Sequence, residues 1–253
     1  MFHKVKSLKG YALDSLDGPI GSVDQFYFDD KHWAVRYLVA GTNAWLPGRK
    51  VLLSPHALAA VDEGKRRIVV GLTKAEIEGA PSPEAHLPVS RQFETSYYGY
   101  YGWPVYWSGP YMWGGYSYLL HDRKKWEPAT PPAKQQDSHL RSTDNVSGYT
   151  VEAKDGEIGH IEDFVVDDKT WAIRYVVVAT RNWWPGKKVL LSTRWIERVS
   201  WGKSRVHVNL TREAIKNAPE YMGDSPLTYE YEEALHRFHK LPGYWADEPA
   251  LRS

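Results

Sequence analysis

The stretch that decides the fold is DGPIGSVDQFYFDDKHWAVRYLVAGTNAWLPGRKVLLSP, residues 17–55, because the chain contains a second version of it. Residues 155–193 read DGEIGHIEDFVVDDKTWAIRYVVVATRNWWPGKKVLLST. A constant shift of 138 residues (148 − 10) aligns residues 10–81 with residues 148–219 without a gap, and about half of the aligned positions are identical. Such a repeat indicates that one folding unit is present in two copies.

Turn residues divide each copy into short strands. Asp17-Gly18 is a dipeptide that tight hairpins favour, and Pro47-Gly48 suits a type II turn. The runs between these turns are rich in β-branched and aromatic residues, and large apolar side chains alternate from Trp33 onward. Because several short strands with local turns bury a core by curling, we expect an all-β fold of two small antiparallel β-barrels in tandem.

Each copy is expected to close with a short helix. Thr73 and Glu76 have the spacing of a capping box at the helix start. Gly79 is placed to end this helix in a left-handed conformation, and Asn217 takes the same position in the second copy. Glycine and asparagine are the residues that best tolerate that conformation, so both copies predict the same kind of helix end.

Composition narrows the class of protein. The chain has 253 residues and a formal net charge of +1, so its overall charge indicates no polyanionic partner. It contains no cysteine, which excludes a disulfide framework, a thiolate metal site and a cysteine nucleophile. There is no apolar run of about 18 residues that could span a bilayer. We therefore expect a cytoplasmic protein with no transmembrane segment and no cofactor.

The repeated run from the Asp-Gly turn through [FV]DD, WA[VI]RY and W[LW]PG[RK]KVLLS resembles the PRC-barrel domain. This module occurs in the H subunit of the bacterial photosynthetic reaction centre and as the C-terminal barrel of the ribosome-maturation factor RimM. The resemblance covers residues 10–81 and 148–219. It implies a tandem PRC-barrel protein of the docking or regulatory kind, and it supplies no catalytic residues to carry across.

The resemblance and the repeat together divide the chain into four segments. The two barrels span residues 1–81 and 148–219. An aromatic insert followed by a polar linker occupies residues 82–147, and a partly helical extension follows at residues 220–253. We expect a non-catalytic binding or regulatory scaffold that acts through protein–protein contacts or self-association, and not an enzyme.

The insert contains SYYGYYGWPVYWSGPYMWGGYSY, residues 96–118, in which no side chain is charged. The stretch either packs back on the apolar outer faces of the barrels or binds a protein partner or a second copy of the chain. Contact with a membrane surface is a further alternative. Nucleic acid is not expected, because no lysine or arginine lies between Arg91 and Arg123. The candidate interface residues are Tyr97, Tyr100, Trp103, Trp107 and Trp113.

Charged residues provide a second group of candidates. The PGRK and PGKK turns place two adjacent cations at equivalent positions, where they either hold an anion or form a solvated turn. Arg36 and Arg174 lie in the middle of strands and are expected to pair with a carboxylate such as Asp29 or Asp167, because an unpaired buried charge is costly. The candidate anion contacts are Arg49, Lys50, Lys187 and Lys188.

The expected helix TYEYEEALHRFHK carries a candidate metal site. Glu232, His236 and His239 are spaced i, i+4 and i+7, so they share one helix face. The alternative is an exposed polar face without a metal. The chain contains no phosphate loop or nucleophile-elbow motif. Two further functions stay open: a small-ligand-binding protein or enzyme that uses the cleft between the barrels, and an RNA- or ribosome-associated factor like RimM.

Overall fold

The structure is a computed structural model that describes residues 1–42, 45–83, 89–109, 112–113, 139–180, 187–223 and 227–246. It contains two compact units, which we name after the repeat that forms most of each. The first-repeat unit comprises Ser7–Thr143 and Asp168–Ala172, and the second-repeat unit comprises Met1–Lys6, Asp144–Asp167 and Ile173–Ser253. Most of the predicted polar linker lies outside the described residues, and the domain boundaries expected from the sequence stay a prediction.

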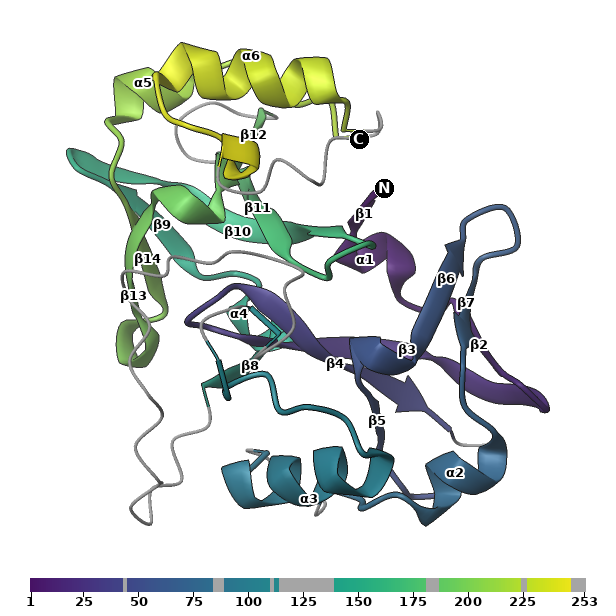
Figure 1. The fold of residues 1–253 in the computed structure, drawn as a ribbon. Coiled ribbons are helices and arrows are strands. Elements are labelled where there is room, and N and C mark those ends of the chain that lie inside the picture. Colours follow the sequence, from purple (N-terminus) through teal and green to yellow (C-terminus); the bar gives the residue numbers. More distant parts are fainter. Residues whose placement is uncertain are drawn as a thin grey trace. The chain divides into compact units, whose positions relative to one another are not determined.

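A seven-stranded sheet forms the body of the first-repeat unit (Figure 1). Six strands follow the spatial order β5-β4-β3-β2-β7-β6, and β8 pairs with β3 outside that order. Neighbouring strands are antiparallel except for β2 and β7, which are parallel. The strands are β2 (Ala12–Ser15), β3 (Gly18–Asp29), β4 (Ala34–Gly41), β5 (Val51–Leu53), β6 (Leu58–Asp62), β7 (Arg67–Val70) and β8 (Leu140–Ser142).

The sheet of the second-repeat unit has the same topology. Its path is β12-β11-β10-β9-β14-β13, and β1 pairs with β10 outside that path. Only β14 and β9 are parallel. The strands are β1 (Phe2–Lys4), β9 (Thr150–Ala153), β10 (Gly156–Asp167), β11 (Ile173–Ala179), β12 (Lys188–Ser192), β13 (Ile196–Ser200) and β14 (Arg205–Val208).

Short helices follow the strands in each repeat. The capping box predicted at Thr73 and Glu76 is confirmed at the start of α2. Two longer helices, α3 and α6, have the same bounds after the shift of 138 residues (229 − 91 and 239 − 101). The helices are α1 (Val5–Leu8), η1 (Pro55–Ala57), α2 (Lys74–Gly79), α3 (Arg91–Tyr101), α4 (Thr143–Val146), η3 (Thr193–Trp195), η4 (Trp201–Lys203), α5 (Arg212–Lys216), α6 (Tyr229–His239) and η5 (Tyr244–Ala246).

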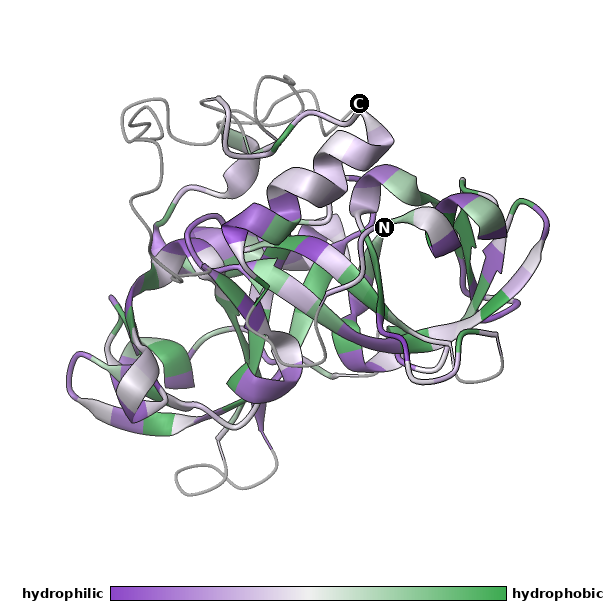
Figure 2. Ribbon diagram, turned by 90° about the horizontal axis from the view of Figure 1, so that it is seen from below, coloured by the Kyte–Doolittle hydropathy of each residue, from purple (hydrophilic) through white to green (hydrophobic). Residues whose placement is uncertain are grey.

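The predicted fold class is confirmed, since both units are mainly β and each sheet is followed by a short helix. Figure 2 shows hydrophobic residues concentrated along the strands and hydrophilic residues at the turns. Every residue of β11 is buried, and β4 is buried from Ala34 to Ala40, so both faces of these central strands are covered. Within the described residues the path of each sheet keeps two separate ends, so the strands do not close into a complete barrel.

The left-handed helix ends predicted at Gly79 and Asn217 are wrong. Asn217 has a φ of −87°, and Gly79 is not among the residues with positive φ. Cationic side chains close these two helices instead, because their N–H groups reach the last free carbonyl groups. Arg49 donates to the carbonyl oxygens of Glu78 and Ala80, and Lys187 Nζ lies 2.9 Å from Lys216 O and 3.5 Å from Ala218 O.

Strand β4 begins at Ala34, one residue later than the predicted alternation. Trp33 instead has a φ of 53° and occupies a tight turn. Asp29 holds this turn, since its Oδ1 accepts from the amides of Lys31 at 2.8 Å and His32 at 3.1 Å. The Trp33 amide also donates to the carbonyl oxygen of Asp29. A left-handed tryptophan is unusual, and the side chain stacks on Phe28 with ring centroids 5.2 Å apart.

Candidate functional site

Helix α3 places the aromatic residues of the insert over the first-repeat sheet. The helix begins after Ser90, whose hydroxyl accepts from the Phe93 amide, and ends at Gly102 in a left-handed conformation. Tyr97 is 1% exposed, and its hydroxyl donates to Leu52 O at 2.8 Å and accepts from Ser54 N at 3.1 Å. The tyrosine thus satisfies backbone groups at β5, one end of the sheet path, and fixes the helix against it.

The five predicted interface residues fall into two groups. Tyr97 and Trp113 are buried, with exposed fractions of 1% and 5%. Tyr100 is 46% exposed, and Trp103 and Trp107 are half-buried. Tyr97 and Trp113 therefore fit the interpretation that the insert packs on its own unit. The other three residues fit the interpretation that it forms an interface.

We use the name aromatic surface for the exposed and half-buried rings of this region: His56, Tyr100, Tyr101, Trp103 and Trp107. Trp107 contacts the buried rings of Tyr98 and Tyr106. Trp103 stacks on Tyr101 with ring centroids 4.3 Å apart and an interplanar angle of 13°. His56 lies 5.5 Å from Trp103, and Tyr100 meets Tyr101 edge-on at 4.9 Å. His56 is exposed at the surface. Partial burial of its ring lowers its pKa, and the nearby charge of Arg36 lowers it further.

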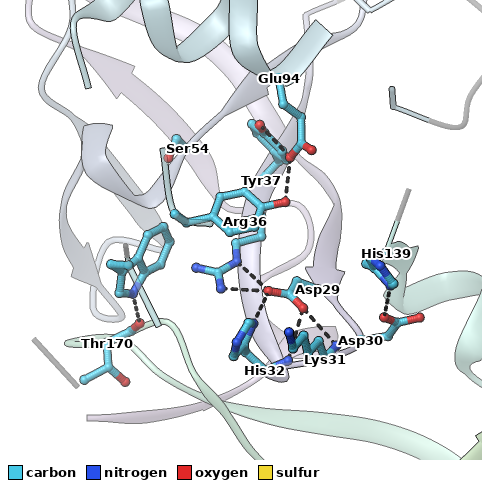
Figure 3. Close-up of polar contacts among 12 residues, drawn as sticks. Asp29, Asp30, Lys31, His32, Arg36, Tyr37, Ser54, Glu94, His139 and Thr170 are labelled. Atoms are coloured by element: carbon cyan, nitrogen blue, oxygen red, sulfur yellow. Dashed lines mark hydrogen bonds and ion pairs between the residues drawn. The ribbon is translucent and has the colours of Figure 1, made fainter. Parts of the chain in front are cut away.

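A buried carboxylate of helix α3, Glu94, lies beside Tyr37 of strand β4 (Figure 3). Glu94 of α3 is 1% exposed and accepts from the hydroxyls of Tyr106 at 2.8 Å and Tyr37 at 3.2 Å. Arg91 lies 2.9 Å from its other oxygen. Burial raises the pKa of Glu94 above its usual value even though Arg91 opposes the shift. The network joins the helix, the following loop and strand β4 in one place.

Arg36 forms the second buried polar contact beneath the insert (Figure 3). Its Nη2 and Nε lie 2.7 Å and 3.1 Å from Asp29 Oδ2, which confirms the predicted pairing. The guanidinium carbon lies 4.0 Å from the centroid of the Tyr106 ring and 4.6 Å from that of Trp113. Burial alone would raise the pKa of Asp29, but the charges of Arg36 and His32 hold it well below its usual range. These aromatic contacts attach the loop after α3 to a fixed cation.

In the second-repeat unit, helix α6 and the segment after it pack on the sheet in the way that α3 and its following loop do in the first, and the sequence analysis missed this. Tyr175 Oη donates to Glu232 Oε1 at 2.7 Å, the equivalent of the contact between Tyr37 and Glu94 (175 − 37 and 232 − 94 both equal 138). Arg174 lies 3.9 Å from the ring of Tyr244 and 3.6 Å from Asp167, which confirms the second predicted ion pair. The signal was present, because Tyr106-Trp107 and Tyr244-Trp245 align at the same shift. The repeat therefore continues into the insert and the C-terminal extension.

The candidate metal residues contribute to this packing of α6. Glu232 accepts from Tyr175, and His236 lies within 3.2 Å of the Tyr175 hydroxyl through Nε2 and 3.3 Å from Leu241 O through Nδ1. His239 packs against Trp195 with ring centroids 4.8 Å apart, and burial lowers its pKa to about 4, with a smaller effect from His236. Among the described residues there is no group of three His, Cys, Asp or Glu side chains placed to hold a metal ion.

Three of the four candidate anion contacts have partners within the chain. Arg49 and Lys187 cap helices α2 and α5, as described above. Lys188 Nζ lies 2.8 Å from Glu162 Oε1, whereas Lys50 is exposed. An anion at these turns would compete with existing helix caps and an ion pair, so the structure does not present two adjacent cations ready for it.

Comparison with known proteins assigns a family to part of the chain. Residues 141–215 match the model of the PRC-barrel domain, so this segment, from β8 to the end of α5, is a PRC-barrel domain. No curated protein sequence matches the chain. In the described part of the chain, no helix is both long enough and apolar enough to cross a membrane.

Proposed function

We propose that the protein is a tandem PRC-barrel, non-catalytic binding module whose aromatic surface binds a protein partner. The family match to the second repeat supports the first part of this proposal. The correspondence of strands and helices at a constant shift of 138 residues supports extending the PRC-barrel assignment to the first repeat.

The observation that carries the proposed binding role is the difference in exposure between the aromatic surface and the rings beneath it. Trp103 and Trp107 are half-buried, while the residues below them, Tyr97, Tyr98 and Tyr106, are at most 3% exposed. Rings held in this way bind with little loss of side-chain freedom, and tryptophan and tyrosine are the residues most enriched at protein interfaces. An apolar or aromatic segment of a protein partner suits a layer without charge.

The buried polar groups support a binding role more than a chemical one. Arg36 and Asp29 bind each other, and Glu94 is bound by two tyrosines and an arginine. All these contacts hold α3 and the loop after it in place over the sheet. An enzyme or small-ligand site would instead direct such groups into an open pocket.

The test is the combined variant Trp103→Ala and Trp107→Ala, compared with wild type as bait in quantitative affinity capture. Trp201→Ala, a half-buried tryptophan of the second-repeat unit, is the matched control. We expect one protein to bind wild type and the control and to be lost from the double variant, with circular dichroism unchanged. Equal capture by all three baits would contradict the proposal. A copurifying small molecule, or RNA binding that weakens with salt, would favour the two alternative functions.

A further inference from the structure

Strand β6 is an exposed sheet edge with an unusual composition. It is the last strand on one side of the first-repeat sheet, and within the described residues it pairs only with β7. Its sequence is LAAVD, in which Ala59 and Ala60 are exposed while Leu58 and Val61 are half-buried. An edge strand presents unpaired N–H and C=O groups, and neutral side chains leave them open to another strand.

The opposite end of the same sheet is protected. Strand β5 is buried along its whole length, and Tyr97 of α3 bonds to the backbone groups of Leu52 and Ser54. Helix α3 therefore lies at the β5 end of the sheet path, while β6 stays at the surface.

The equivalent edge in the second repeat differs in where its charged residues lie. Strand β13 (Ile196–Ser200) corresponds to β6 at the shift of 138 residues and has the same irregularity, a register shift after its first residue. Its second and third residues are Glu197 and Arg198, both exposed, where β6 has two alanines. Charged side chains on an edge strand are a common means of preventing edge-to-edge pairing. Charged side chains therefore occupy the second and third positions of β13, where β6 has alanines, and the one charged residue of β6 is Asp62 at its end.

We propose that β6 is a self-association surface, which pairs antiparallel with β6 of a second copy of this chain. A two-fold pairing centred on Ala60 places Ala60 opposite Ala60, Ala59 opposite Val61, and Leu58 opposite Asp62, so no like charges face each other. Asp62 already lies 3.4 Å from Arg67 of its own sheet. The same pairing of β13 would place Arg198 directly opposite Arg198, which is repulsive. The charge pattern therefore favours pairing through β6 over pairing through β13, with β6 of a second copy of the chain as the partner strand.

The surface is short, and this sets the strength of the pairing. Five residues on each side, with the regular part of the ladder beginning at Ala60, bury less than a standard interface of roughly 1,600 Å². We therefore expect a reversible dimer with a dissociation constant on the order of tens to hundreds of micromolar. This inference concerns a site apart from the aromatic surface and does not depend on the proposed partner.

Sedimentation equilibrium of wild type and Ala60→Arg over about 1–500 µM protein tests the proposal, since this range brackets the expected dissociation constant. Ala60→Arg gives β6 the arginine that β13 has at the equivalent position, Arg198. Wild type and the control Ala60→Thr should rise from 29.0 kDa toward twice that mass, whereas Ala60→Arg should stay at 29.0 kDa. The variant Trp103→Ala with Trp107→Ala should associate like wild type, which separates this inference from the proposed function. A wild type that keeps the mass of one chain at every concentration, or an Ala60→Arg variant that associates equally, would overturn it.

A second experiment keeps the inference testable even if Ala60→Arg does not fold. Since the chain has no cysteine, Ala60→Cys introduces a single thiol at the proposed two-fold centre. Mild oxidation should link Ala60→Cys into dimers at least ten times faster than the matched variant Arg198→Cys in β13. Equal rates of crosslinking for the two variants would count against pairing through β6.

Discussion

Phe2 lies opposite Asp167 in the sheet of the second-repeat unit, although Phe2 opens the first repeat. The relation is reciprocal, because Leu140 opens the second repeat and lies opposite Asp29 in the sheet of the first-repeat unit. Both pairs are related by the same shift (140 − 2 and 167 − 29 equal 138). Each repeat therefore gives its first strand to the sheet of the other, and each sheet is completed by three residues from outside its own repeat.

Replacing Phe2, His3 and Lys4 by glycine should destabilise the second-repeat unit, which does not contain the rest of the first repeat. His3 is 3% exposed and Lys4 Nζ donates to Gly223 O, so the change removes packing and a hydrogen bond along with strand propensity. We expect a loss of about 2–4 kcal/mol in the free energy of unfolding. Hydrogen exchange should show the loss of protection in β10 at Val165–Asp167.

The matched control is the same replacement in β8, Leu140–Ser142. It should reduce protection in β3 at Tyr27–Asp29 and leave β10 unchanged. Loss of protection within the mutated strand's own repeat in both variants would show that the strands are not exchanged.

The local parts of the fold could be predicted from the sequence because they depend on neighbouring residues. Asp17-Gly18 predicts a hairpin, and strands β2 and β3 meet at that turn. The exchange of β1 and β8 could not be predicted in this way. The two strands occupy equivalent positions in similar repeats, so each has the residues to fit either sheet, and only the tertiary structure decides between them.

The candidate site was predicted in part, for a similar reason. The aromatic composition identified residues 96–118, but it did not separate Tyr97 and Trp113, which are buried, from Trp103 and Trp107, which are half-exposed. That difference depends on how α3 and the loop after it pack on the sheet, because of these four residues only Tyr97 lies in the helix. The helix ends at Gly79 and Asn217 were mispredicted because the groups that close them, Arg49 and Lys187, lie about 30 residues away along the chain.

Gly21→Ala should strongly destabilise the first-repeat unit. Gly21 has a φ of 131°, and a Cβ atom at this position would lie 2.1 Å from the carbonyl oxygen of Gly41 in the neighbouring strand. Both the conformation and the backbone contact oppose a side chain, so we expect a loss of about 2–4 kcal/mol. Gly10→Ala, where φ is 75° and the surroundings are open, should cost only about 1 kcal/mol. Similar midpoints in urea denaturation for the two variants would contradict this account.

Asp29→Asn should be costly because it leaves Arg36 as an uncompensated buried charge. Loss of one partner of a buried ion pair typically costs about 3–5 kcal/mol. Asp167→Asn should cost less, since the closest approach of Arg174 is 3.6 Å and the Asp167 side chain is 11% exposed. Adding Arg36→Met to Asp29→Asn should recover part of the loss. Thermal and urea unfolding of the three variants measure the effect, and an equal cost at Asp29 and Asp167 would argue against the role of burial.

Glu94→Gln should change how stability depends on pH. Burial raises the folded-state pKa of Glu94 above the usual 4.5, so the folded protein holds this proton more tightly than the unfolded chain. The stabilisation from this group is complete below pH 4.5 and is lost as the pH rises through the folded-state pKa. The free energy of unfolding of wild type minus that of Glu94→Gln should therefore fall as the pH increases from 4 to 8, measured by urea denaturation at each pH.

Glu76→Gln is the control of opposite sign. Hydrogen bonds from the backbone and hydroxyl of Thr73 lower the pKa of Glu76, so its contribution is present at neutral pH and is lost as the pH falls below its usual 4.5. The difference between wild type and Glu76→Gln should rise as the pH increases toward 4.5 and then level off, whereas the difference for Glu94→Gln should fall above pH 4.5. A flat or rising difference for Glu94→Gln between pH 4.5 and 8 would mean that Glu94 is ionised in the folded protein at least as readily as in the unfolded chain, because only a raised pKa gives the falling slope.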